Sequence, residues 1–247
     1  MDPTEPVQRP ARGPSPRRPR SGRRRRIALG VAVVAGGLLL LGLLLRGEDV
    51  TTATIGGVRE VVVDVDAGSA VLVAGPGPGV TVRAARSWIV GEPITRHDVD
   101  DAGVLHVQAR CPNAAIACHV TEELTVPPGI PVQVTASAGG ITARGLEVPS
   151  LTLRSSAGRV DADDLSVGRL DARSSAGGVN ASFTDPPDEV RAESSAGSVA
   201  LTVPDGSYRV DAGTSAGSVR VEVVQDPASP RFLYAHSSAG DVTIDRG

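Results

Sequence analysis

Two cysteines and a histidine are the first residues whose types and spacing could do chemistry. Cys111 and Cys118 are separated by six residues, and His119 follows directly. Such a set could contribute to a zinc site, but zinc needs a fourth ligand in a closed cage, and the other three histidines lie in unrelated segments. Outside the cytoplasm, a cysteine pair at hairpin spacing more often forms a disulfide, which would stabilise the fold by roughly 2–3 kcal/mol. We therefore predict a Cys111–Cys118 disulfide, no metal and no cofactor.

An acidic stretch, residues 98–103, begins like a calcium-binding loop. Aspartates stand at its first and third positions and Gly103 at its sixth. Its fifth position is Ala102, however, and Ala109 stands where the loop would need a bidentate glutamate. The sequence instead favours an acidic turn between two strands.

The segment Gly213-Thr-Ser215-Ala-Gly217 matches the G-x-S-x-G pattern of a nucleophile elbow. An elbow leads from a strand into a helix, whereas the sequence after Gly217 continues as a strand. Ser215 would also have no base, because His236 belongs to the next coil and is expected to face outward. We predict no catalytic residues, and a surface hydrolase is the third of three functional hypotheses.

The elements that would position these residues follow from a tripeptide, Ser-Ala-Gly, that the chain repeats six times. Its glycines are Gly139, Gly158, Gly177, Gly197, Gly217 and Gly240, at spacings of 19, 19, 20, 20 and 23 residues. A fixed period of this size is typical of stacked coils. Glycine accepts positive φ, and a small neighbour lets successive coils approach to strand spacing, so we interpret each glycine as a structural turn.

Apolar residues alternate with polar ones on both sides of every corner. The residues seven before the glycines are Val132, Leu151, Leu170, Val190, Val210 and Leu233, and those two after are Ile141, Val160, Val179, Val199, Val219 and Val242. A period of two is the pattern of a strand with one face inward. The sequence therefore predicts an all-β, β-solenoid-like stack of coils of about 19–20 residues.

Outward positions carry charges that would line up if the coils stacked in sequence order. One row would read Asp171, Arg191 and Asp211, with alternating signs. We interpret these rows as a solvated face whose charges pair with each other, each pair contributing about 0.2–1 kcal/mol. A binding surface built from the same rows is the alternative.

The N-terminal residues predict a membrane protein with one transmembrane helix before the β domain. Residues 1–26 contain nine arginines, six prolines and no aromatic residue, and we interpret them as a disordered cytoplasmic tail. Residues 27–45 are nineteen uncharged, mostly aliphatic residues, which as a helix would span about 28 Å. The adjoining arginines favour a cytoplasmic N-terminus by the positive-inside rule. A cleaved signal peptide is the alternative, although no Ala-x-Ala site follows the apolar run.

The remaining boundaries are set by composition. Residues 46–57 are a polar juxtamembrane linker, and residues 58–247 form the β-strand-repeat ectodomain. Its first half, 58–129, is irregular, with a degenerate coil at 61–73 and strands expected at 80–85, 104–110 and 120–126. Its second half, 130–247, contains the regular repeats.

The repeated pattern Val-x-Val-x-x-Ser-Ala-Gly-x-Val-x-Val, with residues 120–146 before it, resembles the putative-adhesin family of bacterial β-strand-repeat domains. Leu124–Gly129 and Gly240-Asp241-Val242 match the family best, and alanine before each glycine is a departure that tightens the corner. The resemblance covers roughly residues 58–247. It implies an exported or membrane-anchored domain of unknown biochemical function, without established catalytic residues to transfer.

These features together predict a non-enzymatic, single-pass protein of the bacterial plasma membrane with an extracytoplasmic β domain. Its first expected role is that of an adhesin or an envelope structural or binding module. The alternative is a sensor or accessory subunit of an envelope-stress signalling system, which would need a second membrane protein because the tail holds no domain. Expected partners are the membrane and an unidentified cell-surface or envelope protein or polysaccharide. We expect no nucleic acid, because the arginines adjoin an apolar segment.

Overall fold

The computed structural model describes residues 47–247, which form eighteen strands and no helix. The strands are β1 Gly47–Gly56, β2 Glu60–Ala74, β3 Gly79–Trp88, β4 Ile94–Val99, β5 Val104–Arg110, β6 His119–Val126, β7 Val132–Ala138, β8 Ile141–Arg144, β9 Glu147–Ala157, β10 Val160–Ala176, β11 Val179–Phe183, β12 Glu189–Ala196, β13 Val199–Val203, β14 Ser207–Thr214, β15 Val219–Val221, β16 Val224–Gln225, β17 Phe232–Ala239 and β18 Val242–Arg246. Residues 47–247 accordingly hold no helix that could cross a membrane. The predicted tail and transmembrane helix lie outside the described residues.

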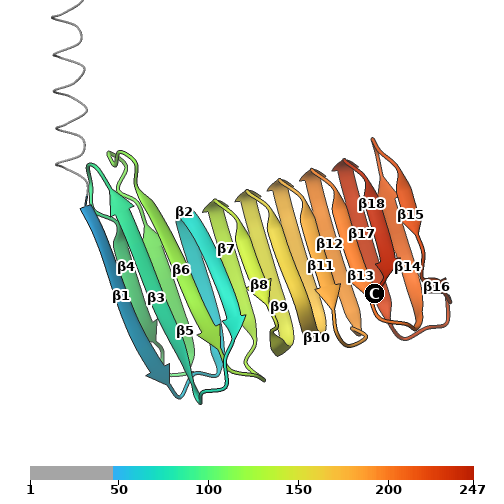
Figure 1. Cartoon of the computed structure of the whole chain (residues 1–247), viewed down its shortest axis with the longest axis horizontal. Helices are drawn as coiled ribbons and strands as arrows, with labels where there is room; N and C mark the ends of the chain where they lie inside the picture. The colour runs from blue at the N-terminus through green and yellow to red at the C-terminus, as the bar shows by residue number, and fades with distance from the viewer. Residues whose placement is uncertain (1–46) are drawn as a thin grey trace, which may run out of the picture. The chain divides into compact units, whose positions relative to one another are not determined.

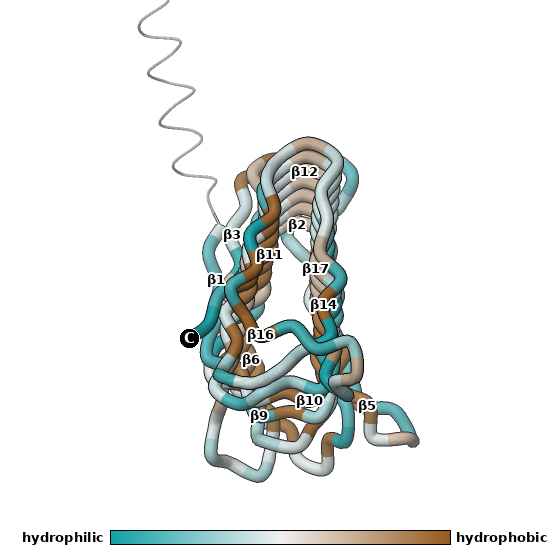
Figure 2. The backbone as a smooth tube through the Cα atoms, turned by 90° about the vertical axis from the view of Figure 1, so that its right-hand side faces the viewer, coloured by the Kyte–Doolittle hydropathy of each residue, from teal (hydrophilic) through white to brown (hydrophobic). Residues whose placement is uncertain are grey.

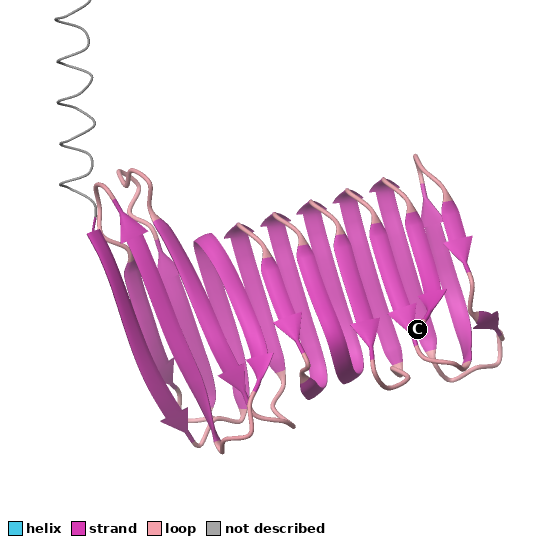
Figure 3. Cartoon of the chain, in the orientation of Figure 1, coloured by secondary structure: helices cyan, strands magenta, loops and turns pink. Residues whose placement is uncertain are grey.

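All strands except the two-residue β16, which pairs only with β14, build two sheets that face each other across one core (Figures 1 and 3). The first sheet has the order β1-β3-β6-β2-β8-β10-β11-β13-β18-β15, and the second the order β4-β5-β2-β7-β9-β10-β12-β17-β14. Figure 2 looks along the stack and shows the arch that joins the sheets at one edge. The Ser-Ala-Gly corners form this arch, so the predicted all-β solenoid-like fold is present in the described residues.

Aliphatic ladders fill the space between the sheets. Five members of the predicted inward row are buried and lie side by side on neighbouring strands: Val132, Leu151, Leu170, Val190 and Leu233. The terminal coil departs from the prediction, because Val210 is only partly buried and Val219 is 45% exposed. Each such side chain contributes about 1.5–3 kcal/mol when it leaves water. The hydrophobic stabilisation of the core is therefore the sum of many similar contributions, one from each buried side chain along the stack.

The coils do not stack in sequence order at the C-terminal end. Strand β17 pairs with β12 on one side and with β14 on the other, and β18 likewise lies between β13 and β15. The last coil in the sequence, residues 232–246, is thus inserted between coils 189–203 and 207–221. This corrects the predicted charge row, because Tyr234 separates Arg191 from Asp211.

The first half contains one more coil than the sequence indicated. Strands β5 and β6 run parallel to the two halves of β2, so residues 104–126 form a coil that stacks before residues 60–74. The strands expected at 80–85, 104–110 and 120–126 are confirmed as β3, β5 and β6. Strands β3 and β4 extend the two sheets antiparallel to β6 and β5.

The expected linker at 46–57 is wrong in the described part of that range. Gly47–Gly56 is the strand β1, which pairs antiparallel with β3 along its whole length. Most of its residues are exposed. Beyond the coil 104–126, the first sheet adds two strands, β3 and β1, and the second adds only β4, so β1 has no strand opposite it. The sequence therefore lacked the alternation that reveals a half-buried strand.

Candidate functional site

The corner glycines are required by close contact between coils. Gly177 has a φ of 150°, and a Cβ on it would lie 2.3 Å from the carbonyl oxygen of Gly158. Gly139, Gly197, Gly217 and Gly240 have φ values of 146° to 151°, which side chains rarely tolerate. Gly158 lies outside this group, yet its Cβ would also meet the backbone of Gly139 at 2.1 Å. The positive φ of five of these glycines, and the lack of room for a Cβ atom at all six, thus favour glycine at these turns.

A ladder of buried hydroxyl groups connects the corners of adjacent coils by hydrogen bonds. Ser155, Ser174, Ser194 and Ser237, each just before the tripeptide, donate hydrogen bonds of 2.8–3.0 Å to glycine carbonyl oxygens of the adjacent coil. Thr214 does the same in the terminal coil. The serines of the tripeptide itself are exposed on the arch. The hydroxyl ladder and the exposed serine row are therefore two separate sets of residues.

The exposed serine row forms one wall of a shallow open pocket on the outer face of the second sheet. The pocket has a volume of about 460 Å³ and is lined by charged, aromatic and hydroxyl side chains: Arg173, Ser174, Ser175, Glu193, Ser194, Ser195, Ser215, Tyr234, His236, Ser237 and Ser238. These residues come from four neighbouring coils. The inserted coil 232–246 brings the two aromatic rings, Tyr234 and His236, into the middle of the site.

Aromatic and charged side chains contact one another in and beside this pocket. The rings of Tyr234 and His236 stack at 4.3 Å, and the Arg191 guanidinium lies 4.3 Å from the Tyr234 ring centre. Arg191 also binds Glu193 at 2.6 Å. The imidazole of His236 lies over Gly213 of the terminal coil, where a Cβ would come within 2.9 Å of it. Glycine at that position therefore makes room for the histidine ring.

The charged side chains of this face pair with each other, as the sequence predicted, and Arg173 and Glu193 among them also line the pocket. Asp171 accepts hydrogen bonds of 2.7 Å from both Arg154 and Arg173. Hydrogen bonding to Asp171 raises the pKa of Arg173 above its ordinary value, with the nearby Glu193 acting in the same direction. These guanidinium groups are held in fixed orientations on the surface.

A family model fits the repeat region. The match spans residues 121–245 and is described as Toastrack DUF4097. The chain belongs to the Toastrack DUF4097 family. No protein with a curated description matches the sequence.

Solved structures of bacterial proteins resemble the Toastrack domain. A putative cell adhesion protein from Clostridium sporogenes has a TM-score of 0.51 at 12% identity, over 81% of this chain and 100% of that one. A putative adhesin from Bacteroides fragilis has a TM-score of 0.38 at 14% identity, over 81% and 97% of the two chains. At such identities the first likeness shows a shared fold.

The Toastrack stack brings Ser215, His236 and Asp211 into one region, which the sequence did not predict. Ser215 and His236 line the same pocket, and His236 Nε2 lies 2.9 Å from the Asp211 carboxylate. The described residues show no hydrogen bond from the Ser215 hydroxyl to the imidazole, and strand β14 leads into another strand. The backbone N–H of Ser215 already donates to Ser237. The nucleophile elbow of an acyl-transfer enzyme is therefore absent here.

The remaining sequence motifs are structural in the Toastrack domain. Cys111 and Cys118 form a disulfide with Cα atoms 6.1 Å apart, which closes the corner of coil 104–126. Asp100 accepts hydrogen bonds from the backbone of Val104 and Ala102, and the first of these chiefly lowers the pKa of its carboxyl group. The acidic stretch is thus a turn between β4 and β5. No cluster of metal-ligating side chains occurs within residues 47–247.

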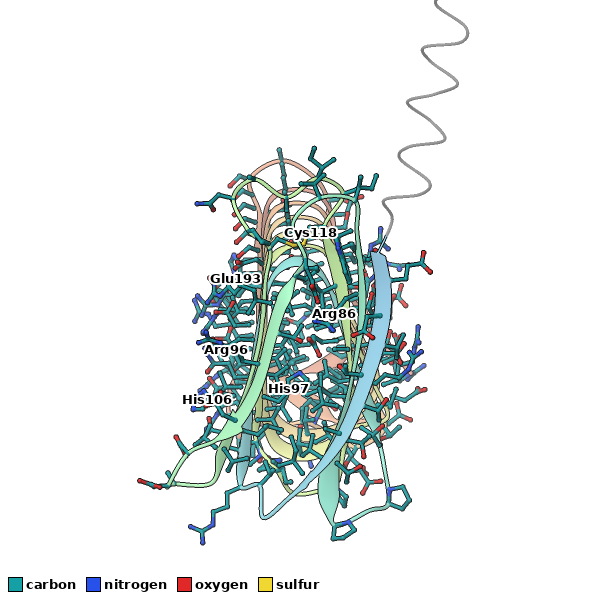
Figure 4. All side chains as sticks on the ribbon, turned by 90° about the vertical axis from the view of Figure 1, so that its left-hand side faces the viewer. Arg86, Arg96, His97, His106, Cys118 and Glu193 are labelled. Atoms are coloured by element: carbon teal, nitrogen blue, oxygen red, sulfur yellow. A yellow bond between two sulfur atoms is a disulfide. The ribbon has the colours of Figure 1, made fainter. Side chains whose placement is uncertain are left out.

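Sequence reasoning missed a buried acid between the two sheets. Glu122 of β6 is fully buried, and neither carboxylate oxygen has a hydrogen-bond partner within the described chain. His97 of β4, which is labelled in Figure 4, belongs to the opposite sheet, and its Nε2 lies 3.6 Å from a carboxylate oxygen of Glu122. Glu122 falls on an inward position of an alternating strand, and this polar residue in an apolar row was the available signal.

Proposed function

We propose that this chain is a non-enzymatic, membrane-anchored protein of the bacterial envelope whose Toastrack domain binds a cell-surface or envelope partner. The arginine-rich residues 1–26 and the nineteen uncharged residues 27–45 support a single-pass anchor with a cytoplasmic N-terminus. The disulfide supports an oxidising compartment for the domain. The fold shared with a bacterial protein named for cell adhesion supports a binding role.

The pocket around Tyr234 carries the proposal most directly. Its open shape and hydroxyl-rich walls suit an extended polar polymer better than a small apolar ligand, which needs an enclosed cavity. Equivalent hydroxyls recur at each coil, about 4.8 Å apart, so a repeating chain could contact several coils in the same way. Polysaccharide is the ligand class that best matches this surface, since its hydroxyl groups pair with serines, arginine and carboxylates.

Binding of isolated envelope polysaccharide to residues 47–247 tests this function. The double variant Arg191→Ala and Tyr234→Ala removes the cation–aromatic pair between Tyr234, which lines the pocket, and Arg191, which packs on its ring. We expect about a tenfold loss of affinity, equivalent to about 1.4 kcal/mol. Arg144→Ala is the matched control, because Arg144 is an exposed arginine on the other sheet.

Each other outcome of that experiment has a defined meaning. Equal loss in the control and the double variant would show that the contact is diffuse and would overturn the assigned site. Recovery of a stoichiometric membrane protein, with no polysaccharide, would favour the sensor or accessory-subunit alternative. Cleavage of the polymer that disappears in Ser215→Ala would favour a hydrolase.

A further inference from the structure

A second surface lies at the opposite end of the stack, where two loops meet. The loops are residues 89–93, between β3 and β4, and residues 111–118, between β5 and β6. Val90 and Ile116 join them through a β-bridge with backbone hydrogen bonds of 2.8 and 3.3 Å. The disulfide closes the second loop and holds it in place. The two loops therefore form one rigid projection.

This projection displays apolar side chains that are exposed or only partly buried. Val90 is 45% exposed and Ile116 is 57% exposed. Trp88 and Ile89 lie beside them and line a hollow of about 220 Å³ with Ser87 and Ala117. We call Trp88, Ile89, Val90 and Ile116 the apolar end patch. Apolar side chains gathered at a loop tip mark a contact surface more often than isolated exposed residues do.

Strand register places the apolar end patch beside the first described residue. Gly47 is paired with Trp88, and Ser87 is paired with His119, so both loops lie at the same end as the start of β1. Figure 4 shows Cys118 at this upper end of the domain. In the sequence, only Arg46 separates Gly47 from the apolar run 27–45. One residue spans at most about 3.6 Å, so an anchor at 27–45 would bring the patch close to the lipid surface.

We propose that the apolar end patch inserts into the headgroup region of the lipid bilayer next to the anchor. This inference rests on the proposed membrane anchoring. Tryptophan is favoured at the membrane interface, and the aliphatic side chains gain by leaving water there. Arg86 binds Asp49 and lies 3.5 Å from Glu92, so one positive charge offsets part of the charge of the two acids beside the patch. The domain would then contact the membrane at two places, the anchor and the apolar end patch. The disulfide-closed loop would set the orientation of the domain.

Trp88 offers a direct test, because it is the only tryptophan of the chain. The full chain is reconstituted into vesicles of phosphatidylcholine and phosphatidylglycerol, and flotation establishes whether it is anchored. Lipids brominated near the headgroup should then quench more than half of the Trp88 fluorescence, while aqueous acrylamide quenches it less than in detergent. Ile116→Asp should reverse both effects. Val224→Asp is the matched control, since Val224 is 66% exposed at the other end of the stack and should behave as the unmodified chain.

The two proposals fail in different ways. A chain that floats with the vesicles but shows acrylamide quenching as in detergent, without bromolipid quenching, would overturn the lipid contact and leave the anchor intact. Shielding of Trp88 from both quenchers would mean that another protein chain covers the patch. This result would also overturn the proposed lipid contact. A chain that does not float would overturn both the anchor and the contact.

Discussion

At the scale of single residues, the corner glycines determine how closely the coils approach. Gly177→Val should lower the free energy of unfolding by at least about 3 kcal/mol, because the new side chain meets both an unfavourable φ and the backbone of Gly158. Gly56→Val is the control, since a Cβ on Gly56 would have no atom within 4 Å and the φ of Gly56 is not positive. Denaturant unfolding of residues 47–247 measures both. Similar losses in the two variants would mean that coil contact at the corner does not matter.

At the scale of elements, a carboxylate connects the terminal coil to the inserted one. Asp241, at the start of the turn into β18, accepts hydrogen bonds of 2.8 Å from both the backbone N–H and the hydroxyl of Ser218. The backbone hydrogen bond, and then the hydroxyl one, lowers the pKa of Asp241 below its ordinary value. The ionised form is therefore the one that holds the two corners together.

The pH dependence of this contact follows from the direction of the shift. The pKa of Asp241 is lower in the folded chain than in the unfolded one. The contribution of its carboxylate to folded-state stability is therefore fully present above the ordinary pKa of about 3.9, and it is lost as the pH falls through the lowered pKa of the folded state. Amide exchange at Ser218 should accelerate in that acid range relative to its neighbours. Asp241→Asn should show faster exchange at neutral pH and no further acid step. An acid step that persists in Asp241→Asn would assign the effect to another group.

At the scale of the whole molecule, the order of the coils makes the C-terminal residues an interior part of the stack. Deletion of residues 226–247 removes coil 232–246, which lies between coils 189–203 and 207–221. We expect residues 207–225 to lose hydrogen-exchange protection as well, because their partner strands are gone. Deletion of β1 is the control, since β1 pairs only with β3 among the described strands. Its removal should reduce hydrogen-exchange protection in β3 alone. Protection of 207–225 in the truncated chain would show that this coil can stack directly on 189–203.

The sequence by itself determined the all-β repeat, the inward aliphatic rows and the turn glycines, because a period of two and a fixed repeat length are local properties of the chain. It also predicted the Cys111–Cys118 disulfide, from the short spacing of the two cysteines and the expected location outside the cytoplasm. Coil order depends on contacts between distant segments, and the strands of every coil offer nearly the same hydrogen-bonding edge to a neighbour. For this reason only the tertiary structure placed Tyr234 and His236 beside Ser215. The edge strand β1 and the buried Glu122 were likewise decided in three dimensions. Pairing across a sheet leaves no alternation in the exposed strand β1, and the alternation of β6 marks Glu122 as inward without showing what lies opposite it.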